Sequence, residues 1–220
     1  EEVEDFPLQY FYDVRESILR IRVENSHLEE DELFDLRRSL STIADMVKIL
    51  NHSDDDDEPE DGWKREKKYP YPALHRLSQD VVTFPQLIQR IDQILDKFGK
   101  IRDNATPELL QIRRELAKTE GSISRTLYSI LRSAQSEGIV EKDVTPTLRD
   151  GRLVIPVIPT LKRKIKGIVH DESATGKTVF IEPTEVVEAN NRVRELEGEE
   201  RKEIIRILTD RKSTRLNSSH

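Results

Sequence analysis

Residues 167–183 read GIVHDESATGKTVFIEP, and this stretch decides between two different folds. Its segment ATGKT matches the second half of the phosphate-binding loop of nucleotide hydrolases, G-x-x-x-x-G-K-[ST], which opens a helix directly after a strand. The first glycine of that pattern would fall where the chain has Asp171. The segment that follows, TVFIE, is β-branched and aromatic, which favours a strand. The sequence therefore predicts a strand–turn–strand hairpin with a polar tip, and no nucleotide site.

A second hairpin is predicted directly upstream. The run VTPTLRDGRLVIPV contains Asp150-Gly151 between two extended segments, and Asp-Gly in this setting is a strong signal for a two-residue hairpin turn. The two hairpins together predict four short antiparallel strands between about residues 143 and 182.

Four helices are predicted between residues 13 and 98, and the first is a short one at residues 13–23. Residues 29–50 carry apolar side chains at alternating steps of three and four, typical of a helix packed lengthwise on another. A short helix is predicted after the proline-rich KYPYP, and a longer one with Thr83 as N-cap and Gln86 completing a capping box. The apolar positions of the two longer helices are Leu33, Leu36, Leu40, Ile43, Val47 and Leu50, and Phe84, Leu87, Ile91, Ile94 and Phe98.

Two longer helices flank the β segment directly. Thr106 and Pro107 form an N-cap and N1 pair, and the helix they begin extends to about residue 136, which at 1.5 Å per residue is about 45 Å. Helix is predicted again after Pro183, with Thr184 as cap. Its apolar positions are Val186, Val193, Leu196, Ile204 and Leu208, and the pairs Glu188–Arg192 and Glu197–Arg201 stand on its exposed face. The fold class is therefore mainly α with a small β insertion, with long lever helices in coiled-coil-like packing.

Composition agrees with exposed helices and excludes several classes of protein. Of 220 residues, 35% are hydrophobic, 36% charged and 5% aromatic, which suits narrow apolar stripes better than a large core. The chain has no cysteine, so neither a disulfide framework nor a thiolate metal site is possible. No apolar run approaches the ~20 residues that a bilayer requires, so we expect a cytoplasmic protein without a membrane partner.

The two ends suggest a piece of a longer protein. The chain begins with Glu1, and its only methionine is Met46. The last ten residues, RKSTRLNSSH, break the preceding pattern and are expected to be a non-native tail. We therefore predict a helical region at 1–137, a β segment at 138–183, a return helix at 184–210 and the tail at 211–220.

Two clusters invite a chemical interpretation that we do not favour. Seven acidic residues at 54–61 could suggest a metal site, but they lack the ligand spacing of a calcium loop, and a solvated loop is predicted. His170, Asp171 and Ser173 could suggest a nucleophilic relay, but adjacent strand residues point to opposite faces. We expect Asp171 and Ser173 to bond turn amides and His170 to pack at the strand end. No catalytic, cofactor or metal residue is therefore predicted.

A local reversal of charge supplies the candidate contact residues. The chain has a formal net charge of −7, and −10 without the tail, because 33 basic residues then face 43 acidic ones. Residues 152–170 nevertheless contain no acidic residue. Such a patch could hold a phosphate backbone through about four contacts, without aromatic residues that would read bases. The alternative is a solvated strand face near Asp171 and Glu172. The candidate nucleic-acid contacts are Arg152, Lys162, Arg163, Lys164, Lys166 and Lys177.

Three motifs in order resemble the MutS family, and more closely its second bacterial branch, the MutS-two proteins. They are R-[DN]-G-R-x-V-I-P-V at Arg149–Val157, G-x-V-H-D-x-S-x-[ST]-G-x-T-x-F-I-E-P at Gly167–Pro183, and V-E-x-N-N-x-[VIL]-R-E-L at Val187–Leu196. The likeness spans most of residues 6–209. It departs from the family at residues 158–161, IPTL, where many relatives have a KAE-type stretch, and it ends after Asp210.

The resemblance implies a core, lever and clamp segment of a larger protein. Family members are homodimeric, DNA-binding ATPases that use ATP and Mg²⁺, and many carry a Smr nuclease domain. They are linked to suppressing recombination on branched or unusual DNA, and some bind and split collided ribosomes. The Walker motifs and the Smr domain are absent from this chain, so no cofactor is expected in it. Binding to DNA, engagement of ribosomal RNA, and a purely structural role in supporting a dimer remain the alternatives.

Overall fold

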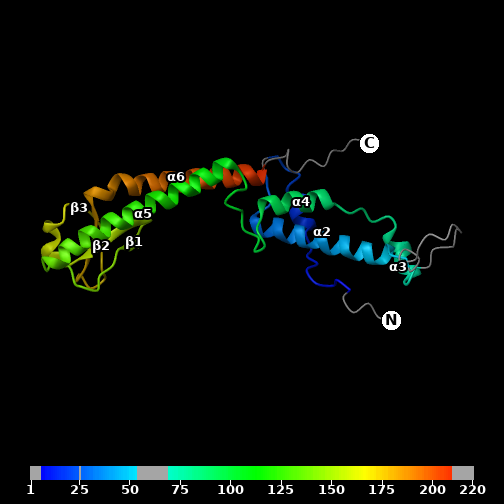
Figure 1. Cartoon of the computed structure of the whole chain (residues 1–220), viewed down its shortest axis with the longest axis horizontal. Helices are drawn as coiled ribbons and strands as arrows, with labels where there is room; N and C mark the ends of the chain where they lie inside the picture. Colours follow the sequence, from blue (N-terminus) through cyan, green and yellow to red (C-terminus); the bar gives the residue numbers. More distant parts are fainter. Residues whose placement is uncertain (1–5, 25, 54–68, 210–220) are drawn as a thin grey trace, which may run out of the picture. The chain divides into compact units, whose positions relative to one another are not determined.

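The computed structural model describes residues 6–24, 26–53 and 69–209. The chain divides into two compact units, one formed by residues 1–105 and 205–220, the other by residues 106–204. Helices dominate both units, and the second also contains a four-stranded antiparallel sheet (Figure 1). The predicted fold class, mainly α with a small β insertion, is confirmed. The coiled-coil-like packing of the helices stays a prediction.

The first unit is built around α2 (Glu30–Asn51), which packs against α3 (Pro72–Ser78) and α4 (Pro85–Ile94) and follows the short α1 (Arg15–Arg20). Leu33 and Leu36 are buried as the apolar pattern predicts. The next buried positions are Ser39 and Thr42, and not Leu40 and Ile43. These hydroxyls bond the N-terminal segment, since Ser39 Oγ accepts from Tyr12 N at 2.9 Å and Thr42 Oγ1 donates to Gln9 O at 3.0 Å.

The predicted start and end of α4 are wrong. Its N-cap is Phe84, which makes no side-chain cap bond, so Thr83 and Gln86 do not form a capping box. The helix ends at Ile94 because a turn follows, in which one carboxylate oxygen of Asp96 accepts from Phe98 N at 2.8 Å and Lys100 N at 2.9 Å. Phe98 therefore lies beyond the helix and is 72% exposed.

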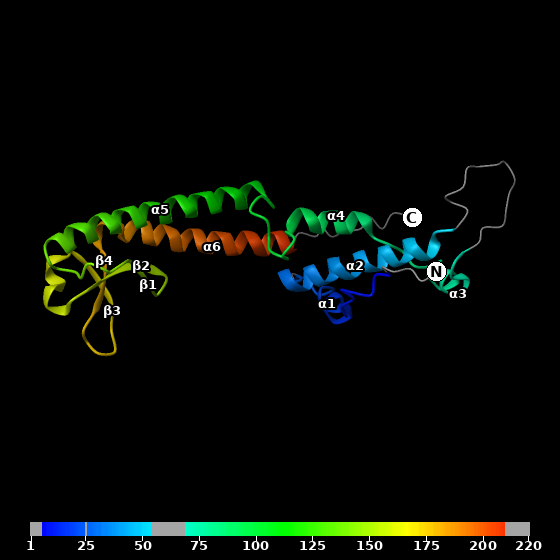
Figure 2. The same ribbon diagram turned by 60° about the horizontal axis from the view of Figure 1, so that its bottom comes forward.

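The second unit contains two long helices that are neighbours in space, and the strands of its sheet come between them in sequence. The first, α5 (Pro107–Ser136), begins as predicted, with Thr106 Oγ1 accepting from Leu109 N at 3.1 Å. The second, α6 (Val187–Thr209), runs beside it in the opposite direction (Figures 1 and 2). Ion pairs join them, at 2.7 Å between Arg113 and Glu200 and 2.9 Å between Arg192 and Glu115. Arg192 therefore pairs with Glu115, Glu195 and Glu199, and not with Glu188 as predicted.

Four strands form the sheet in the order β1-β2-β4-β3. They are β1 (Thr147–Arg149), β2 (Arg152–Val157), β3 (Gly167–Glu172) and β4 (Val179–Pro183). Both predicted hairpins are confirmed, since β1 pairs with β2 and β3 with β4, each antiparallel. Asp150 and Gly151 both have positive φ, 49° and 74°, as a type I′ turn requires. The β3–β4 register shifts between Val169 and Asp171, which makes a bulge at His170.

The core of this unit joins α5, the sheet and α6. Thr184 does not cap α6, because a 3₁₀ turn, η3 (Thr184–Val186), comes first and α6 begins at Val187. Further along α6 the buried residues are Glu203 and Ile207, one position before the predicted Ile204 and Leu208. The buried core residues are Leu116, Ile123, Leu127, Leu131 and Ala134 of α5, Ile139, Val140, Ile155, Val157, Val179 and Ile181 around the sheet, and Val186, Val193 and Leu196 after it.

Two predictions concern residues that the structure does not describe. The acidic run at 54–61 and the proposed tail at 211–220 both lie outside the described residues. Within the described ranges, no helix combines the length and the apolar character needed to cross a bilayer.

Candidate nucleic-acid interface

The basic segment LKRKIKG forms a 3₁₀ helix and the link that follows it, and does not lie on a strand. The helix is η2 (Pro159–Lys164), and Pro159 stands at its first position. The proline ring fixes a helical φ there, and its missing N–H would have had no partner within the helix. Leu161 and Ile165 pack against the core of the unit, so the residues between them are turned outward. Figure 2 shows this segment beside the C-terminal end of α5. The three basic side chains Lys162, Arg163 and Lys164 are exposed there.

Two further candidates lie on either side of strand β3. Lys166 is exposed at its start, and Lys177 is exposed in the turn that joins β3 to β4. Ser173 closes this turn, because its N donates to Thr178 O at 2.8 Å and its Oγ accepts from Thr178 N at 3.0 Å. Gly176 has a φ of 66°. The ATGKT sequence is therefore a hairpin tip, as predicted, and opens no helix.

Five of the six predicted contact residues carry exposed charges. Within the described part of the chain, Lys162, Arg163, Lys164, Lys166 and Lys177 form no ion pair, whereas Arg149 at the end of β1 lies 3.6 Å from Asp171. We call these five residues the basic patch. Unpaired cations keep their full charge available to an anionic partner.

Arg152, the sixth candidate, is engaged inside the protein. Its side chain is 18% exposed, and its Nη1 donates to Glu182 Oε1 at 2.7 Å. Its Nη2 donates to Asn191 Oδ1 at 2.6 Å. A charge neutralised by a buried carboxylate contributes less to attraction of a phosphate than an exposed one, so we keep Arg152 apart from the basic patch.

Glu182 is the centre of a polar network that the sequence patterns do not predict. Its side chain is fully buried in the strand VFIEP, between apolar neighbours. Oε1 accepts from Arg152 and, at 2.9 Å, from Asn190 Nδ2, and Oε2 lies 2.5 Å from His170 Nε2. We call Glu182, Arg152, His170, Asn190 and Asn191 the Glu182 network. It joins strands β2, β3 and β4 to the first turns of α6.

The pKa of Glu182 reflects two opposing effects. Burial raises it, because the charged form loses water. Hydrogen bonds from His170, Asn190 and Arg152 outweigh that effect and hold the pKa of the carboxyl below its usual 4.5. The carboxylate is therefore charged at neutral pH, which is the form that its three donors require.

The relay interpretation of His170, Asp171 and Ser173 is excluded by their partners. The imidazole faces Glu182, Asp171 Oδ1 accepts from the Glu172 amide at 2.8 Å, and Ser173 Oγ accepts from Thr178 N. Ser173 bonds the amide of Thr178 at the turn, as predicted, whereas the amide that Asp171 bonds, that of Glu172, lies within β3. The sequence does contain one indication of the Glu182 network. A carboxylate, a histidine and two asparagines stand in segments that are otherwise apolar or buried, and polar side chains in such places need hydrogen-bond partners.

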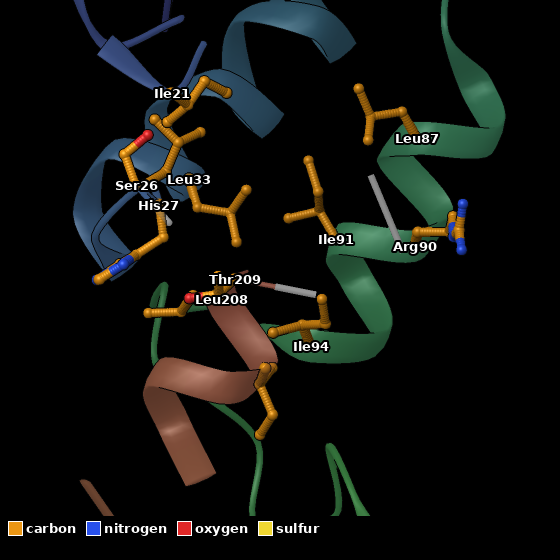
Figure 3. Close-up of a pocket in the computed structure, with 12 residues that line it drawn as sticks. Ile21, Ser26, His27, Leu33, Leu87, Arg90, Ile91, Ile94, Leu208 and Thr209 are labelled. Carbon is orange, nitrogen blue, oxygen red and sulfur yellow. The ribbon is translucent and has the colours of Figure 1, made fainter. Parts of the chain in front are cut away.

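Neither the small pocket of the first unit nor a metal-ligand cluster among the described residues indicates an active site. One pocket in the first unit has a volume of about 90 Å³ and is lined by apolar side chains such as Leu33, Ile91 and Leu208 (Figure 3). Ligand sites generally measure about 300–1,000 Å³, so this pocket is too small for a nucleotide. Among the described residues, no group of three or more potential ligands could hold a metal ion.

The architecture thus defines a class: two long antiparallel helices that carry a small sheet with exposed cations. A search of family models finds no match. Curated relatives do match. The chain is 36% identical over 204 residues to the endonuclease MutS2 of Levilactobacillus brevis, which covers 93% of the chain and 24% of the relative. It is 32% identical, with the same coverage, to that of a Geobacillus species. Over 146 residues it is 39% identical to that of Pelotomaculum thermopropionicum, covering 66% of the chain and 18% of the relative.

These relatives share one name, and the chain belongs to the MutS2 family. The chain spans about a quarter or less of the length of the curated relatives that it matches.

Proposed function

We propose that this chain is the lever-and-clamp segment of a MutS2 protein and that it holds the phosphate backbone of DNA through the basic patch. In this proposal α5 and α6 are the levers, the four-stranded sheet with η2 is the clamp, and ATP and Mg²⁺ bind elsewhere in the longer protein. The observation that carries the proposal is the basic patch: five exposed cations on η2 and the flanks of β3 that form no ion pair with any residue the structure describes, in a chain with a net charge of −7.

The surroundings of the patch support recognition of backbone rather than bases. Phe180, the aromatic residue nearest in sequence to the tip, is buried and lies under the Arg149 guanidinium at 4.1 Å. Cations without exposed aromatic residues bind phosphates regardless of sequence. The patch therefore suits a partner chosen by its shape, such as branched DNA, and the limiting of recombination in the family is consistent with such a partner.

The Glu182 network gives the proposed clamp a fixed base. Three of its strands and the start of α6 are tied to one buried carboxylate. A movement of α6 would therefore carry the sheet and the basic patch with it. In the proposed mechanism, nucleotide turnover elsewhere in the protein moves the levers and repositions the patch.

Ribosomal RNA remains the second candidate partner, because its phosphates present the same charge to a patch that reads no bases. A purely structural module that supports a homodimer is the third. These candidates differ in what the basic patch contributes: binding to DNA, binding to ribosomes, or neither.

The test replaces Lys162, Arg163, Lys164 and Lys166 together by Glu. A matched control replaces four exposed cations elsewhere, Lys48, Lys142, Arg201 and Lys202, by Glu. Binding to branched DNA and to ribosomes is measured by fluorescence anisotropy and by co-sedimentation between 50 and 200 mM salt. Four lost phosphate contacts should make the slope of log K against log salt shallower by about 3.6.

The outcomes separate the candidates. Loss of DNA binding in the patch variant, with the control near wild type, supports the proposal. Loss of ribosome binding alone would show that the basic patch binds ribosomal RNA and not DNA. Unchanged binding to both, with oligomeric state intact, would leave the structural role.

A further inference from the structure

The face of α5 that points away from the core carries cations and no carboxylate. The buried stripe of the helix includes Leu116, Ile123 and Leu127. Successive residues of a helix are rotated by about 100°. The face opposite the buried stripe is therefore formed by residues spaced alternately four and three apart, from residue 114 to residue 132. It contains Arg114, Lys118, Gly121, Arg125, Tyr128 and Arg132, which we call the α5 stripe.

All four cations of the α5 stripe are exposed, and within the described residues none of them forms an ion pair. The acidic residues of α5 lie off this face, and Glu115 is already engaged by Arg192 at 2.9 Å. Tyr128, within the same row, is 47% exposed. The exposed face of a helix generally carries positive and negative side chains mixed together. A row of positive side chains alone, in an acidic chain, is therefore typical of a surface that binds an anionic partner.

Gly121, at the middle of the stripe, is an independent observation. Glycine is the least favourable residue in a helix interior apart from proline. Nothing in the packing requires it, because an added Cβ would meet only Arg125 Nη1, at 3.5 Å, which is ordinary contact. A missing side chain between two cations lets a partner approach the helix backbone closely.

The surface beside the stripe is hollowed. An open groove of about 510 Å³ is lined by Arg114, Glu115, Lys118, Thr119, Ser122 and Ala189. Its free charges are positive, since Glu115 is paired with Arg192. The Ser122 hydroxyl can donate to an anion, whereas Thr119 Oγ1 already donates to Glu115 O at 2.8 Å. Phosphate is bound in proteins by cations together with a hydroxyl donor of this kind.

We propose that the α5 stripe is a second binding surface for duplex DNA, laid along the phosphate backbone. From Arg114 to Arg132 it extends about 27 Å, since a helix rises 1.5 Å per residue. That length matches about eight steps of 3.4 Å along one DNA strand. This surface is separate from the basic patch and goes beyond the proposed function, although η2 lies near the α5 end that carries Arg132 (Figure 2).

The test neutralises the stripe in the whole chain, through Arg114→Gln, Lys118→Gln, Arg125→Gln and Arg132→Gln combined. The control carries Lys48→Gln, Lys142→Gln, Arg201→Gln and Lys202→Gln, with the same loss of charge. Binding to a 30-base-pair duplex DNA and to an RNA duplex of the same sequence is measured by anisotropy from 50 to 200 mM salt. The stripe variant should have a salt slope for DNA that is shallower by about 3.6, from four lost contacts, whereas the control stays near wild type.

A second variant tests close approach without changing charge. Gly121→Gln places a side chain at the centre of the stripe and should weaken DNA binding, while helix content by circular dichroism is kept. Gly198→Gln is its control, because Gly198 lies on α6, away from the stripe, and an added Cβ there would meet only Arg201, at 3.9 Å. Equal affinity of the two glycine variants, or a stripe slope equal to that of its control, would overturn the inference. A loss confined to RNA would also overturn the assignment to DNA.

The basic patch variant distinguishes this inference from the proposed function. If the patch variant loses DNA and the stripe variant does not, the proposed function stands and the stripe has no such role. If the stripe variant alone loses DNA, the binding surface is on α5 and the proposed function is wrong.

Discussion

Glu182 Oε2, on a strand whose other residues are apolar, lies 2.5 Å from His170 Nε2. The two residues come from neighbouring strands, β4 and β3, and His170 stands at the bulge where the register of these strands shifts. The bulge re-aims the imidazole so that it meets a carboxylate that is fully buried. A structural contact between motif residues therefore explains positions that could be mistaken for catalytic ones.

Removal of the buried carboxylate should destabilise the second unit strongly. Glu182→Ala leaves Arg152 and His170, whose side chains are 18% and 19% exposed, without their shared partner. Breaking a buried pair in this way costs about 3 kcal/mol or more of unfolding free energy. The measurement is urea unfolding followed by circular dichroism. Glu185→Ala is the control, because Glu185 is exposed only three residues away. Similar unfolding midpoints for the two variants would show that the network contributes little.

Acid should remove the contribution of Glu182. Its pKa is lowered in the folded protein from the usual 4.5, so the folded state holds this proton less tightly than the unfolded state. The stabilisation is therefore complete above pH 4.5 and is lost as the pH falls through the folded pKa. The difference in unfolding free energy between wild type and Glu182→Gln should shrink steadily from pH 5 to pH 3. Other carboxyls with lowered pKa, such as Glu32, which lies at about 2, cancel in this comparison. A difference that is constant over this range would contradict the assignment.

Local signals in the sequence predicted most of the β segment. Asp150-Gly151 fixed the first turn because few residues tolerate two successive positive φ values. The strand character of TVFIE excluded a nucleotide loop at Gly176 and Lys177. Thr106 and Pro107 marked the start of α5 to the residue. In each case the determining interaction lies within a few residues along the chain.

Interactions distant in sequence account for what was missed. The Glu182 network combines four segments, and no one of them reveals it alone. Arg152 was grouped with the exposed cations because its burial depends on a strand 30 residues away. Thr83 has the sequence of a cap, but Phe84 occupies the position before Pro85, and proline favours the first turn of a helix.

The N-cap of α5 should matter more than an ordinary cap. Thr106 Oγ1 accepts from Leu109 N at 3.1 Å and donates to Glu203 Oε1 of α6 at 2.6 Å. Thr106→Ala removes both bonds and should lower the unfolding free energy by about 2 kcal/mol, at the upper end for caps. Thr106→Ser keeps the hydroxyl and should recover most of the loss in thermal or urea unfolding. If Ser and Ala behave alike, the methyl group rather than the hydroxyl is responsible.

Among the glycines of the β segment, Gly167 should tolerate substitution least, for steric reasons. An added Cβ would lie 2.2 Å from the carbonyl oxygen of Glu182 and 2.8 Å from Cγ2 of Ile181. Because these atoms belong to the paired strand β4, relief requires the strands to separate. Gly167→Ala should therefore lower the unfolding free energy by about 2 kcal/mol and weaken amide protection in β3 and β4 in hydrogen exchange. Gly198→Ala in α6 should instead stabilise the chain by up to about 1 kcal/mol, since its Cβ would meet only Arg201, at 3.9 Å. Equal stability of the two alanine variants would mean that the close approach of β3 to β4 is not maintained in solution.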